Sequence, residues 1–442
     1  MKESSSLVMV VKAEWGKLRE AYIHRPGIEM FLGLLEPYSF LYDRFFSMNE
    51  AVFEHMGLEH ALTRSGVDVK RLKPSFVRVV EKEEIIRQRV IQYILKNVRY
   101  LGASAKSGKE YLERVVNSMD GETLFNILLL NPSIETRMKK NGAGSQRRII
   151  YRYVTLQVPL ANLYYLRDQQ AATDLGLVYG RMAKPQRRRE VLITKVTFEG
   201  LGVPTAWTTR APATFEGGDF IPAGEFALIG LSDRTNRQGV DQLLRHGLSY
   251  DEVVVVSKPA HPLIAGGYDP MLYMHLDTYF NIPGEGLAVG AGTLIDNTNV
   301  QVYVKMGKNK YRLDEAASGV SLAQYLKQKE FNLIKLSTFE QLAYAPNFLT
   351  LDDRKILAVD SERNIKTTLA KIQRLRAVDP HKYAAFCDQA MYEYNKLKAA
   401  RDLFPRKKEL EEWGVDVTPL DLDALTGGYG AARCMVAAVK RG

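Results

Sequence analysis

Five residues of the types that carry out acid–base and nucleophilic chemistry are spread over the last two thirds of the chain. They are Asp168, Glu216, His275, Asp277 and Cys434. A planar guanidinium is matched by carboxylates that accept paired N–H bonds, and attack on its central carbon requires a thiolate and a nearby base. Each residue alone has an ordinary structural explanation, but together they form the set that guanidino chemistry needs.

His275 and Asp277 belong to one tripeptide, His275-Leu276-Asp277, which follows the apolar run 271–274. We interpret this run as a strand, in which alternation would direct the side chains of His275 and Asp277 to the same face. A base and a carboxylate would then share a surface. The alternative for the tripeptide alone is a strand end whose polar residues face water.

Two further acidic segments add carboxylates. Glu216-Gly217-Gly218-Asp219 carries two glycines that let the backbone turn sharply and approach another group closely. Asp168 ends the aromatic run that begins at Asn162. Both segments are also compatible with ordinary turns, so their meaning depends on the other residues.

The chain has two cysteines, Cys387 and Cys434, which excludes a disulfide framework. Cys434 follows the glycine-rich segment 427–430 and an arginine, which is one way to present a reactive thiol. Cys387 lies in an apolar, helix-like stretch where we expect an inert, packed thiol. No Cys/His cluster has metal-ligand spacing, so we predict neither a metal nor another cofactor.

A repeated unit must position these residues. A helix, a glycine or polar break and a short aliphatic strand occur in this order five times, with the strands at 66–69, 202–204, 251–256, 331–336 and 414–417. Such a unit cannot bury its apolar side alone, so the units must stack in a line or close in a ring. Unequal spacing without capping repeats favours a ring. The candidate residues fall after different repeat strands, which indicates a central site.

Two segments interrupt the repeats. Residues 80–140 have helical periodicity, and Asp120-Gly121-Glu122 could open a helix there. Residues 364–403 form a second charged helical segment, interrupted at Asp379-Pro380. We therefore predict an α/β catalytic domain made of 1–79 and 141–442, a helical insertion at 80–140, and a second helical insertion at 364–403.

The composition agrees with a globular, cytoplasmic protein. Of 442 residues, 46% are hydrophobic, and no window approaches the roughly 20 apolar residues of a membrane span. Lys and Arg exceed Asp and Glu by 61 to 51, which gives a formal charge of +10. This excess is scattered apart from 187–189 and 406–408, which disfavours a nucleic-acid partner. We expect no membrane association.

At these positions the sequence resembles the arginine deiminase family, within the group of guanidino-modifying enzymes that includes amidinotransferases. The resemblance covers most of the chain outside the two insertions. The similar motifs, in order, are 16–18 with 24–27, Asn162 to Asp168, Arg187 to Glu190, Glu216 to Asp219, Ser232 to Thr235, Met274 to Thr278, and Arg433-Cys434-Met435. Several motifs in the right order make the resemblance specific.

The resemblance implies a five-bladed α/β propeller with an inserted helical domain. It implies that Cys434 is the nucleophile, His275 the acid and then the base, and Glu216 its orienting partner. Asp168 and Asp277 would clamp the guanidinium. The residues assigned to the rest of the substrate are Asn162, Arg187, Arg234, Tyr165 and Gly428.

The sequence departs from the family pattern at three positions. Gln169 and Ala432 stand where the family usually has proline, and Tyr429 occupies a loop position where many deiminases carry an arginine that grips the substrate and gates the site. The second insertion is also unlike the compact deiminases and could reshape the entrance.

The resemblance predicts hydrolysis of arginine to citrulline and ammonia through a Cys-linked amidino intermediate, with arginine or a related guanidino compound as the small-molecule partner. The same five residues also suit an amidinotransferase that passes the amidino group to an amine acceptor such as agmatine, lysine or a diamine. A non-catalytic, nucleic-acid-binding propeller is the alternative from another class. Large α/β enzymes often associate, so we expect a homo-oligomer.

Overall fold

The computed structural model describes residues 11–140 and 148–442. Within them, five sheets share one strand pattern, in which the first strand is antiparallel to the second and the third is parallel to the second. In this order the strands are β20 (Ala437–Arg441), β1 (Leu18–Ile23) and β2 (Asp68–Arg71); β6 (Gln170–Thr173), β7 (Gly176–Tyr179) and β8 (Thr205–Thr208); β9 (Phe220–Ala223), β10 (Phe226–Gly230) and β11 (Glu252–Val256); β12 (Phe280–Gly284), β13 (Leu287–Ala291) and β16 (Asn332–Leu336); β17 (Leu349–Asp352), β18 (Lys355–Val359) and β19 (Asp416–Leu420). The fold is therefore α/β with mixed sheets, as the sequence predicts at the level of class.

The third strands, β2, β8, β11, β16 and β19, correspond to the five repeat strands predicted from the sequence: four overlap the predicted residues, and β8 begins one residue after the predicted segment 202–204. Each follows a helix or helical turn: α2 (Met48–Arg64), α7 (Glu190–Gly200), α8 (Arg237–Gln242), α10 (Leu322–Gln328) and α14 (Lys408–Glu412). Local signals define these helices, since the Ser47 hydroxyl caps α2 and Ser321 forms a capping box with Gln324 on α10. The five-unit repeat is confirmed.

The sheet that contains β10 and β11 is strongly apolar. β10 is buried along its whole length between β9 and β11, and β11 is a run of four valines behind Glu252. β-branched residues suit a strand that is covered on both faces. This sheet alone among the five is extended, by β14 (Val300–Gly307) and β15 (Lys310–Asp314), within the described residues.

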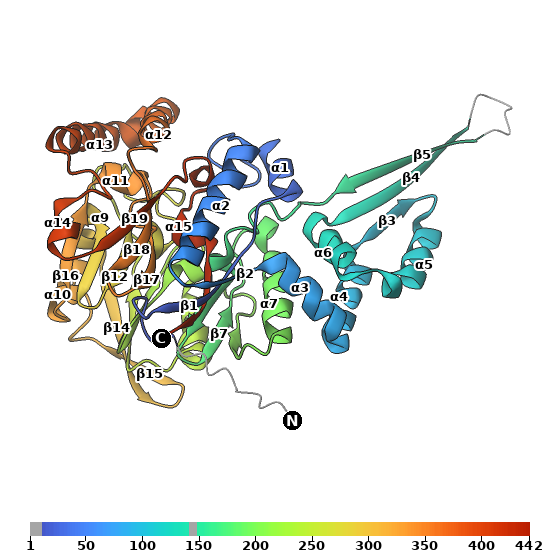
Figure 1. Cartoon of the computed structure of the whole chain (residues 1–442), viewed down its shortest axis with the longest axis horizontal. Helices are drawn as coiled ribbons and strands as arrows, with labels where there is room; N and C mark the ends of the chain where they lie inside the picture. The colour runs from blue at the N-terminus through green and yellow to red at the C-terminus, as the bar shows by residue number, and fades with distance from the viewer. Residues whose placement is uncertain (1–10, 141–147) are drawn as a thin grey trace.

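The predicted insertion at 80–140 is only partly helical. It contains α4 (Glu84–Asn97), α5 (Ala105–Val115) and α6 (Gly121–Leu130), and Asp120 caps α6 as expected. It also contains β3 (Arg99–Gly102) and β4 (Pro132–Lys140), which pair with each other and, through β4, with β5 (Arg148–Leu156). Figure 1 shows this sheet and its helices as a lobe beside the five-sheet body, with β4 and β5 extending away from it.

The helical interpretation missed these strands for a physical reason. Asn131 adopts a left-handed conformation and Pro132 follows it, so α6 ends there and an extended segment begins. That segment is stabilised by pairing with residues 148–156, which helical periodicity within 80–140 does not reveal. The helix α3 (Leu72–Lys82) also crosses the predicted boundary at residue 80 and packs against α6 and α7.

The second insertion is a pair of helices, α12 (Ile365–Val378) and α13 (Pro380–Ala400), that pack against each other at one end of the body (Figure 1). Asp379 caps α13 and Pro380 begins it, so the break lies where the sequence predicts it. Cys387 is buried in α13, where its thiol donates to the carbonyl of Ile372. The prediction of a packed structural thiol is confirmed.

Four short helices complete the described elements: α1 (Ile28–Leu34), α9 (Gly292–Asn297), α11 (Thr338–Leu342) and α15 (Ala432–Met435). No helix in residues 11–140 and 148–442 combines the length and apolar character needed to cross a bilayer.

Candidate active site

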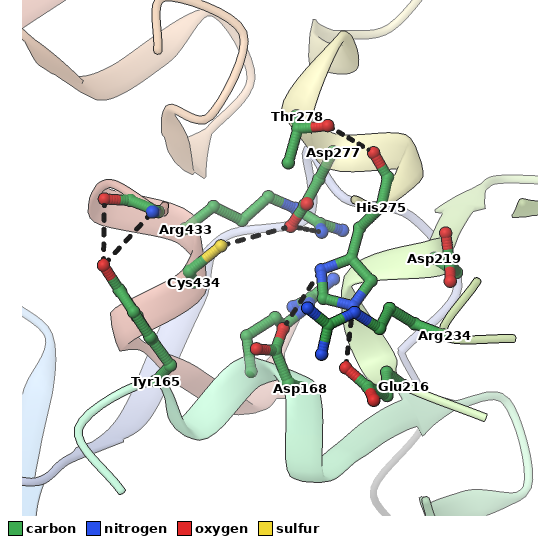
Figure 2. A network of polar contacts seen from close by, with 12 residues as sticks. Tyr165, Asp168, Glu216, Asp219, Arg234, His275, Asp277, Thr278, Arg433 and Cys434 are labelled. Atoms are coloured by element: carbon green, nitrogen blue, oxygen red, sulfur yellow. Dashed lines mark hydrogen bonds and ion pairs between the residues drawn. The ribbon is translucent and has the colours of Figure 1, made fainter. Parts of the chain in front are cut away.

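The candidate residues lie at equivalent places in the repeated unit, immediately before its first strand. Asp168 lies in a 3₁₀ turn before β6, Glu216 begins a similar turn before β9, and His275 and Asp277 lie at the turn before β12. Cys434 lies in α15, which precedes β20. Figure 2 shows the five side chains in one cluster, with Asp168 and Glu216 beside the imidazole of His275 and Cys434 beside Asp277. The predicted set is thus brought together by the repeat.

The unit that starts with β17 contributes a residue that the sequence interpretation missed. Asn347 precedes β17, and its side-chain amide donates to the carbonyl of Asp277 at 3.1 Å. Its side-chain oxygen accepts from the backbone N–H of Ala431 at 2.8 Å and of Cys434 at 3.4 Å. Asn347 therefore ties the turn of Asp277 to the helix of Cys434. Its position before the first strand of a repeat is the signal that could have identified it.

The expectation that His275 and Asp277 lie on one strand is wrong. Residues 276–278 form a 3₁₀ turn, and the strand begins only at Phe280. Asp219 holds this turn, because its carboxylate accepts from the backbone N–H of Leu276 at 2.9 Å and from Ser232 Oγ at 2.7 Å. The hydrogen bond from the backbone of Leu276 to the buried carboxylate of Asp219 therefore determines this turn, although the apolar run 271–274 suggested a strand.

His275 is buried, and each of its two ring nitrogens faces a carboxylate. Its Nε2 lies 2.9 Å from Glu216 Oε2, and its Nδ1 lies 3.6 Å from Asp168 Oδ1. Burial alone would lower the pKa of His275, but the charge of Asp168 and the hydrogen bond to Glu216 outweigh it and raise the pKa to about 9. The imidazole is therefore protonated at neutral pH, ready to donate a proton.

Glu216 is held as a carboxylate. Its second oxygen, Oε1, accepts from the backbone N–H of Ala183 at 2.9 Å. Burial alone would raise its pKa, but the positive charges of Arg234 and His275 outweigh burial and lower it. An ionised, hydrogen-bonded carboxylate fixes the orientation of the imidazole.

Asp168 and Asp277 each bind one resident arginine through a single oxygen. Asp168 Oδ2 accepts from Arg187 at 2.7 Å, and Asp277 Oδ2 accepts from Arg433 at 2.8 Å. The other oxygen of each carboxylate, Oδ1, is buried with no hydrogen-bond partner among the residues described. Buried acceptors are normally satisfied, so these two oxygens need N–H donors from a bound molecule.

Cys434 lies beside one of these carboxylates, with Sγ 3.9 Å from Asp277 Oδ2. The thiol is buried, and burial together with the negative charges of Asp277 and Asp168 raises its pKa well above the ordinary value. Asn347 and Arg433 act in the opposite direction but do not cancel this effect. The thiol is therefore protonated in the free protein.

The five residues predicted to bind the substrate differ in whether their side chains already have hydrogen-bond partners within the protein. Asn162 donates to the carbonyl of Phe40 at 2.6 Å, and Arg187 is fully engaged with Asp168 and Glu190. Arg234 is buried, and its two terminal nitrogens have no hydrogen-bond partner in the described part of the chain. Arg234 is thus the cation of this group that is free to bind an anion.

Tyr165 and Gly428 shape the loop before Cys434. The Tyr165 hydroxyl donates to the carbonyl of Leu425 at 2.8 Å and accepts from the N–H of Gly430 at 3.1 Å. A Cβ on Gly428 would lie 2.1 Å from the hydroxyl of Tyr164, so only glycine fits there. These residues pack the loop against the aromatic run that ends at Asp168.

A buried charge cluster lies behind the site and was not predicted. Glu14 accepts hydrogen bonds from three guanidinium groups, those of Arg167, Arg433 and Arg441. These positive charges outweigh burial and lower the pKa of Glu14 strongly. Because Arg433 also binds Asp277, Glu14 helps to orient one of the two half-paired carboxylates.

Asp168, Glu216 and His275 also place ligand-type atoms within 4.8 Å of one another, which is close enough for a metal ion. In this structure the same atoms pair among themselves and Asp168 also binds Arg187. We therefore interpret the cluster as a proton-transfer group.

Comparison with known proteins gives one consistent result. The sequence model of the family described as arginine deiminase matches residues 38–441. The arginine deiminase of Halobacterium salinarum is 27% identical over 419 residues, which cover 78% of this chain and 85% of that protein. The arginine deiminase of Oenococcus oeni is 24% identical over 387 residues, covering 80% and 89%.

Solved structures with a similar arrangement include a dimethylarginine dimethylaminohydrolase from Pseudomonas aeruginosa in complex with citrulline. It has 14% identity and a TM-score of 0.49, and the alignment covers 96% of this chain and 100% of that chain. An amidinotransferase from Microseira wollei has 12% identity and a TM-score of 0.48, covering 98% and 97%.

Proposed function

Because the chain belongs to the arginine deiminase family, we propose that it hydrolyses arginine to citrulline and ammonia. The observation that carries this proposal is a pair of buried carboxylate oxygens that accept no hydrogen bond among the described residues, Asp168 Oδ1, which lies 3.6 Å from His275 Nδ1, and Asp277 Oδ1. A guanidinium cation offers N–H donors in a planar fork, which matches two carboxylates that each lack a donor.

The first half of the reaction forms a covalent intermediate. The guanidinium, held by Asp168 and Asp277, brings a positive charge next to Cys434 and favours loss of the thiol proton to water. The thiolate adds to the central carbon, and His275 protonates the terminal nitrogen, which leaves as ammonia. The substrate then remains bound through sulfur as an S-alkylthiouronium group.

The second half releases the product. Neutral His275 takes a proton from water, and the resulting hydroxide adds to the same carbon. The carbon–sulfur bond breaks, the hydroxyl proton of the adduct passes to water, citrulline leaves and the thiolate is regenerated. Glu216 keeps the imidazole in one orientation through both proton transfers, and its charge stabilises the imidazolium.

For the amino-acid end of the substrate we propose Arg234 as the main ligand of the carboxylate. Its free terminal nitrogens support this role. Arg187 supports the clamp by holding Asp168, and Asn162 supports the same wall through the carbonyl of Phe40. Tyr165 and Gly428 shape the loop that covers the substrate.

Hydrolysis and amidino transfer use the same five catalytic residues, so the products must distinguish them. We expect purified enzyme with arginine alone to release citrulline and ammonia in equal amounts. Added lysine, agmatine or a diamine should not divert the amidino group. Ornithine that forms only when an amine is present would establish an amidinotransferase instead. A brief arginine soak followed by intact-mass measurement should reveal the thiouronium adduct on the protein.

We further propose that the five sheets form a closed five-bladed propeller with the site at its centre. Contacts between neighbouring units support this arrangement, since β20 contacts β6, β6 contacts the turn of Glu216, β9 contacts β12, β12 contacts β17, and β17 contacts β1. This cyclic order returns to its starting unit. Small-angle scattering and an experimental structure would test it.

We also propose a cytoplasmic homo-oligomer that does not bind nucleic acid. The basic run 187–189 supports the last point, because Arg187 is buried in ion pairs while Arg188 and Arg189 donate to backbone carbonyls. A reducing compartment would keep Cys434 as a thiol. Sedimentation measurements and salt-dependent RNA binding would test these points.

A further inference from the structure

Lys371 is a buried cation in the inserted helix α12 that the proposed reaction does not use. Its side chain is 8% exposed, and its Nζ donates to the hydroxyl of Tyr344 at 3.1 Å. The ammonium lies 4.7 Å from the ring centroid of Tyr344 and 5.5 Å from that of Tyr429. Two aromatic faces and one neutral hydroxyl stabilise the cation only modestly.

Lys371 has no carboxylate within 4.0 Å in the part of the chain that the structure describes. Asp43 is the acid whose charge affects Lys371 most. It already binds Arg44 at 2.8 Å and Arg374 at 3.5 Å. Arg44 also lies 3.8 Å from Asp423, but Lys371 and Arg374 are left to share Asp43, so Lys371 has no carboxylate of its own among the described residues. Burial of a cation without a counter-ion is costly, so this positive excess favours an anionic ligand.

The charged groups that face Lys371 from other elements agree with this account. Asp269 is the second acid that acts on it, and Asp269 is already bound by Lys382 and the hydroxyl of Tyr383. Burial, together with the charges of Arg44 and Arg374, lowers the pKa of Lys371 to about 8. The ammonium is therefore still mostly charged at neutral pH but loses its proton on mild alkalinisation.

Both aromatic partners of Lys371 belong to segments that hold the thiol. Tyr429 lies in the glycine loop that Tyr165 anchors through Gly430, just before Cys434. Tyr344 packs in the same apolar cluster as Cys434, and the charge of Cys434 contributes to its raised pKa. The ammonium thus lies beside the covering loop of the proposed site.

We propose that Lys371 is a specificity-determining residue that binds the carboxylate of the substrate, so that the enzyme selects arginine over guanidino compounds without a negative charge at that end. The proposal rests on the proposed function and deepens it. A carboxylate has about four acceptor sites, and the fork of Arg234 fills two of them. The compact ammonium of Lys371 can occupy another, supplied by a helix that the repeated units do not contain.

The test compares L-arginine with agmatine, which has the same guanidinium but no carboxylate. The variants are Lys371→Met, which removes the charge at similar volume, Lys371→Arg, which restores it, and Lys366→Met, an exposed lysine on the same helix, as the matched control. For Lys371→Met we expect the KM for arginine to rise roughly ten- to hundredfold with little change in kcat. The KM for agmatine should stay unchanged, and Lys371→Arg should recover most of the loss.

Several results would overturn the proposal. An unchanged ratio of kcat/KM for arginine over agmatine in Lys371→Met would do so, as would an equal rise in KM for both compounds, because either result indicates a purely structural role. If wild-type enzyme releases no citrulline from arginine, the proposed function fails instead, and the two failures are therefore distinguishable.

A second measurement does not depend on the folding of Lys371→Met. In wild-type enzyme the ratio of kcat/KM for arginine over agmatine should fall as pH rises through about 8, because the ammonium becomes neutral. In Lys371→Arg the ratio should stay flat over the same range, since a guanidinium keeps its charge. A ratio independent of pH in wild-type enzyme, or the same decline in both proteins, would contradict the assignment.

Discussion

Cys434 Sγ lies 3.9 Å from Asp277 Oδ2, the oxygen that also accepts a hydrogen bond from Arg433. A thiolate and a carboxylate at this distance repel each other in a buried site, so the free enzyme keeps the thiol protonated. A guanidinium that binds Asp277 and Asp168 places a positive charge beside the sulfur and reverses this balance. In the proposed mechanism the substrate therefore ionises the nucleophile that attacks it.

This relationship predicts that a small cation activates Cys434 toward alkylation. At pH 7, iodoacetamide should modify Cys434 slowly in the free enzyme, because the thiol is protonated. Millimolar guanidinium, below denaturing concentrations, should accelerate the modification several-fold by lowering the pKa of the thiol. Peptide mass spectrometry would measure both rates, with tetramethylammonium as a cation control that cannot donate N–H bonds. Equal rates with both cations would contradict substrate-assisted ionisation.

The two cysteines should respond very differently to substitution. Cys434→Ala removes the nucleophile and should reduce citrulline formation by at least about four orders of magnitude. Cys387→Ala should leave kcat and KM near wild type and lower the melting temperature slightly, because it removes only a packed sulfur in α13. Steady-state kinetics and thermal melts would measure these effects. A comparable loss of activity in both variants would argue against covalent catalysis at Cys434.

The pH dependence of kcat/KM should report on His275. In the proposed mechanism the imidazolium is the acid, and its pKa is raised to about 9, so activity should fall as pH increases above that value. Glu216→Gln removes a negative charge that stabilises the imidazolium, so it should move this alkaline limb to lower pH and reduce kcat. Arginine turnover between pH 5 and 10 would measure both profiles. An alkaline limb that stays in place in Glu216→Gln would assign it to another group.

Much of the fold was predictable because it depends on local signals. Glycine or polar breaks before aliphatic runs located four of the five third strands, and the remaining predicted segment, 202–204, lies just ahead of β8. The helix start at Asp120 and the interruption at Asp379-Pro380 also lie where the sequence predicts them. The pairing of β4 with β5 was missed because it depends on residues on the two sides of a hairpin rather than on one periodic segment. The turn at 276–278 was missed because a buried carboxylate, Asp219, determines it from another unit.

The sequence predicted the candidate residues of the site but not the residues that hold them in position. The five candidate residues were predicted because their side-chain types together suit guanidino chemistry and because they lie in motifs that resemble those of the family. Asn347 and Glu14 act only through other residues, by holding Cys434 and Asp277 or by pairing with three arginines. Such roles follow from proximity in space. The equivalence of Asn347 to Asp168 in the repeat becomes visible only when the strands are aligned by their pairing.

Asn347→Ala should separate positioning from chemistry. The substitution removes the bond to the carbonyl of Asp277 and leaves the buried N–H groups of Ala431 and Cys434 without their acceptor. We expect a loss of about 1–3 kcal/mol in the free energy of unfolding and roughly a hundredfold decrease in kcat, because small misplacements of reacting groups are costly. Asn332→Ala, at an exposed asparagine in β16, is the control. A wild-type kcat in Asn347→Ala would show that the tie is dispensable.

Glu14→Gln should destabilise the protein in a pH-dependent way. Removal of this charge leaves three buried guanidinium groups without their shared partner, which should cost about 3–5 kcal/mol at pH 7. The folded-state pKa of Glu14 lies well below its ordinary value of 4.5, so the folded state binds a proton less readily than the unfolded state. The contribution of Glu14 is therefore complete above pH 4.5 and is lost progressively as pH falls below it.

Urea unfolding at a series of pH values would measure this difference in the free energy of unfolding between wild-type protein and Glu14→Gln. It should be largest near neutral pH and shrink in acid. Glu225→Gln, at an exposed glutamate between β9 and β10, should change stability by less than about 0.5 kcal/mol throughout. A difference for Glu14→Gln that does not shrink below pH 4.5 would mean that lost packing, rather than lost charge, causes the destabilisation.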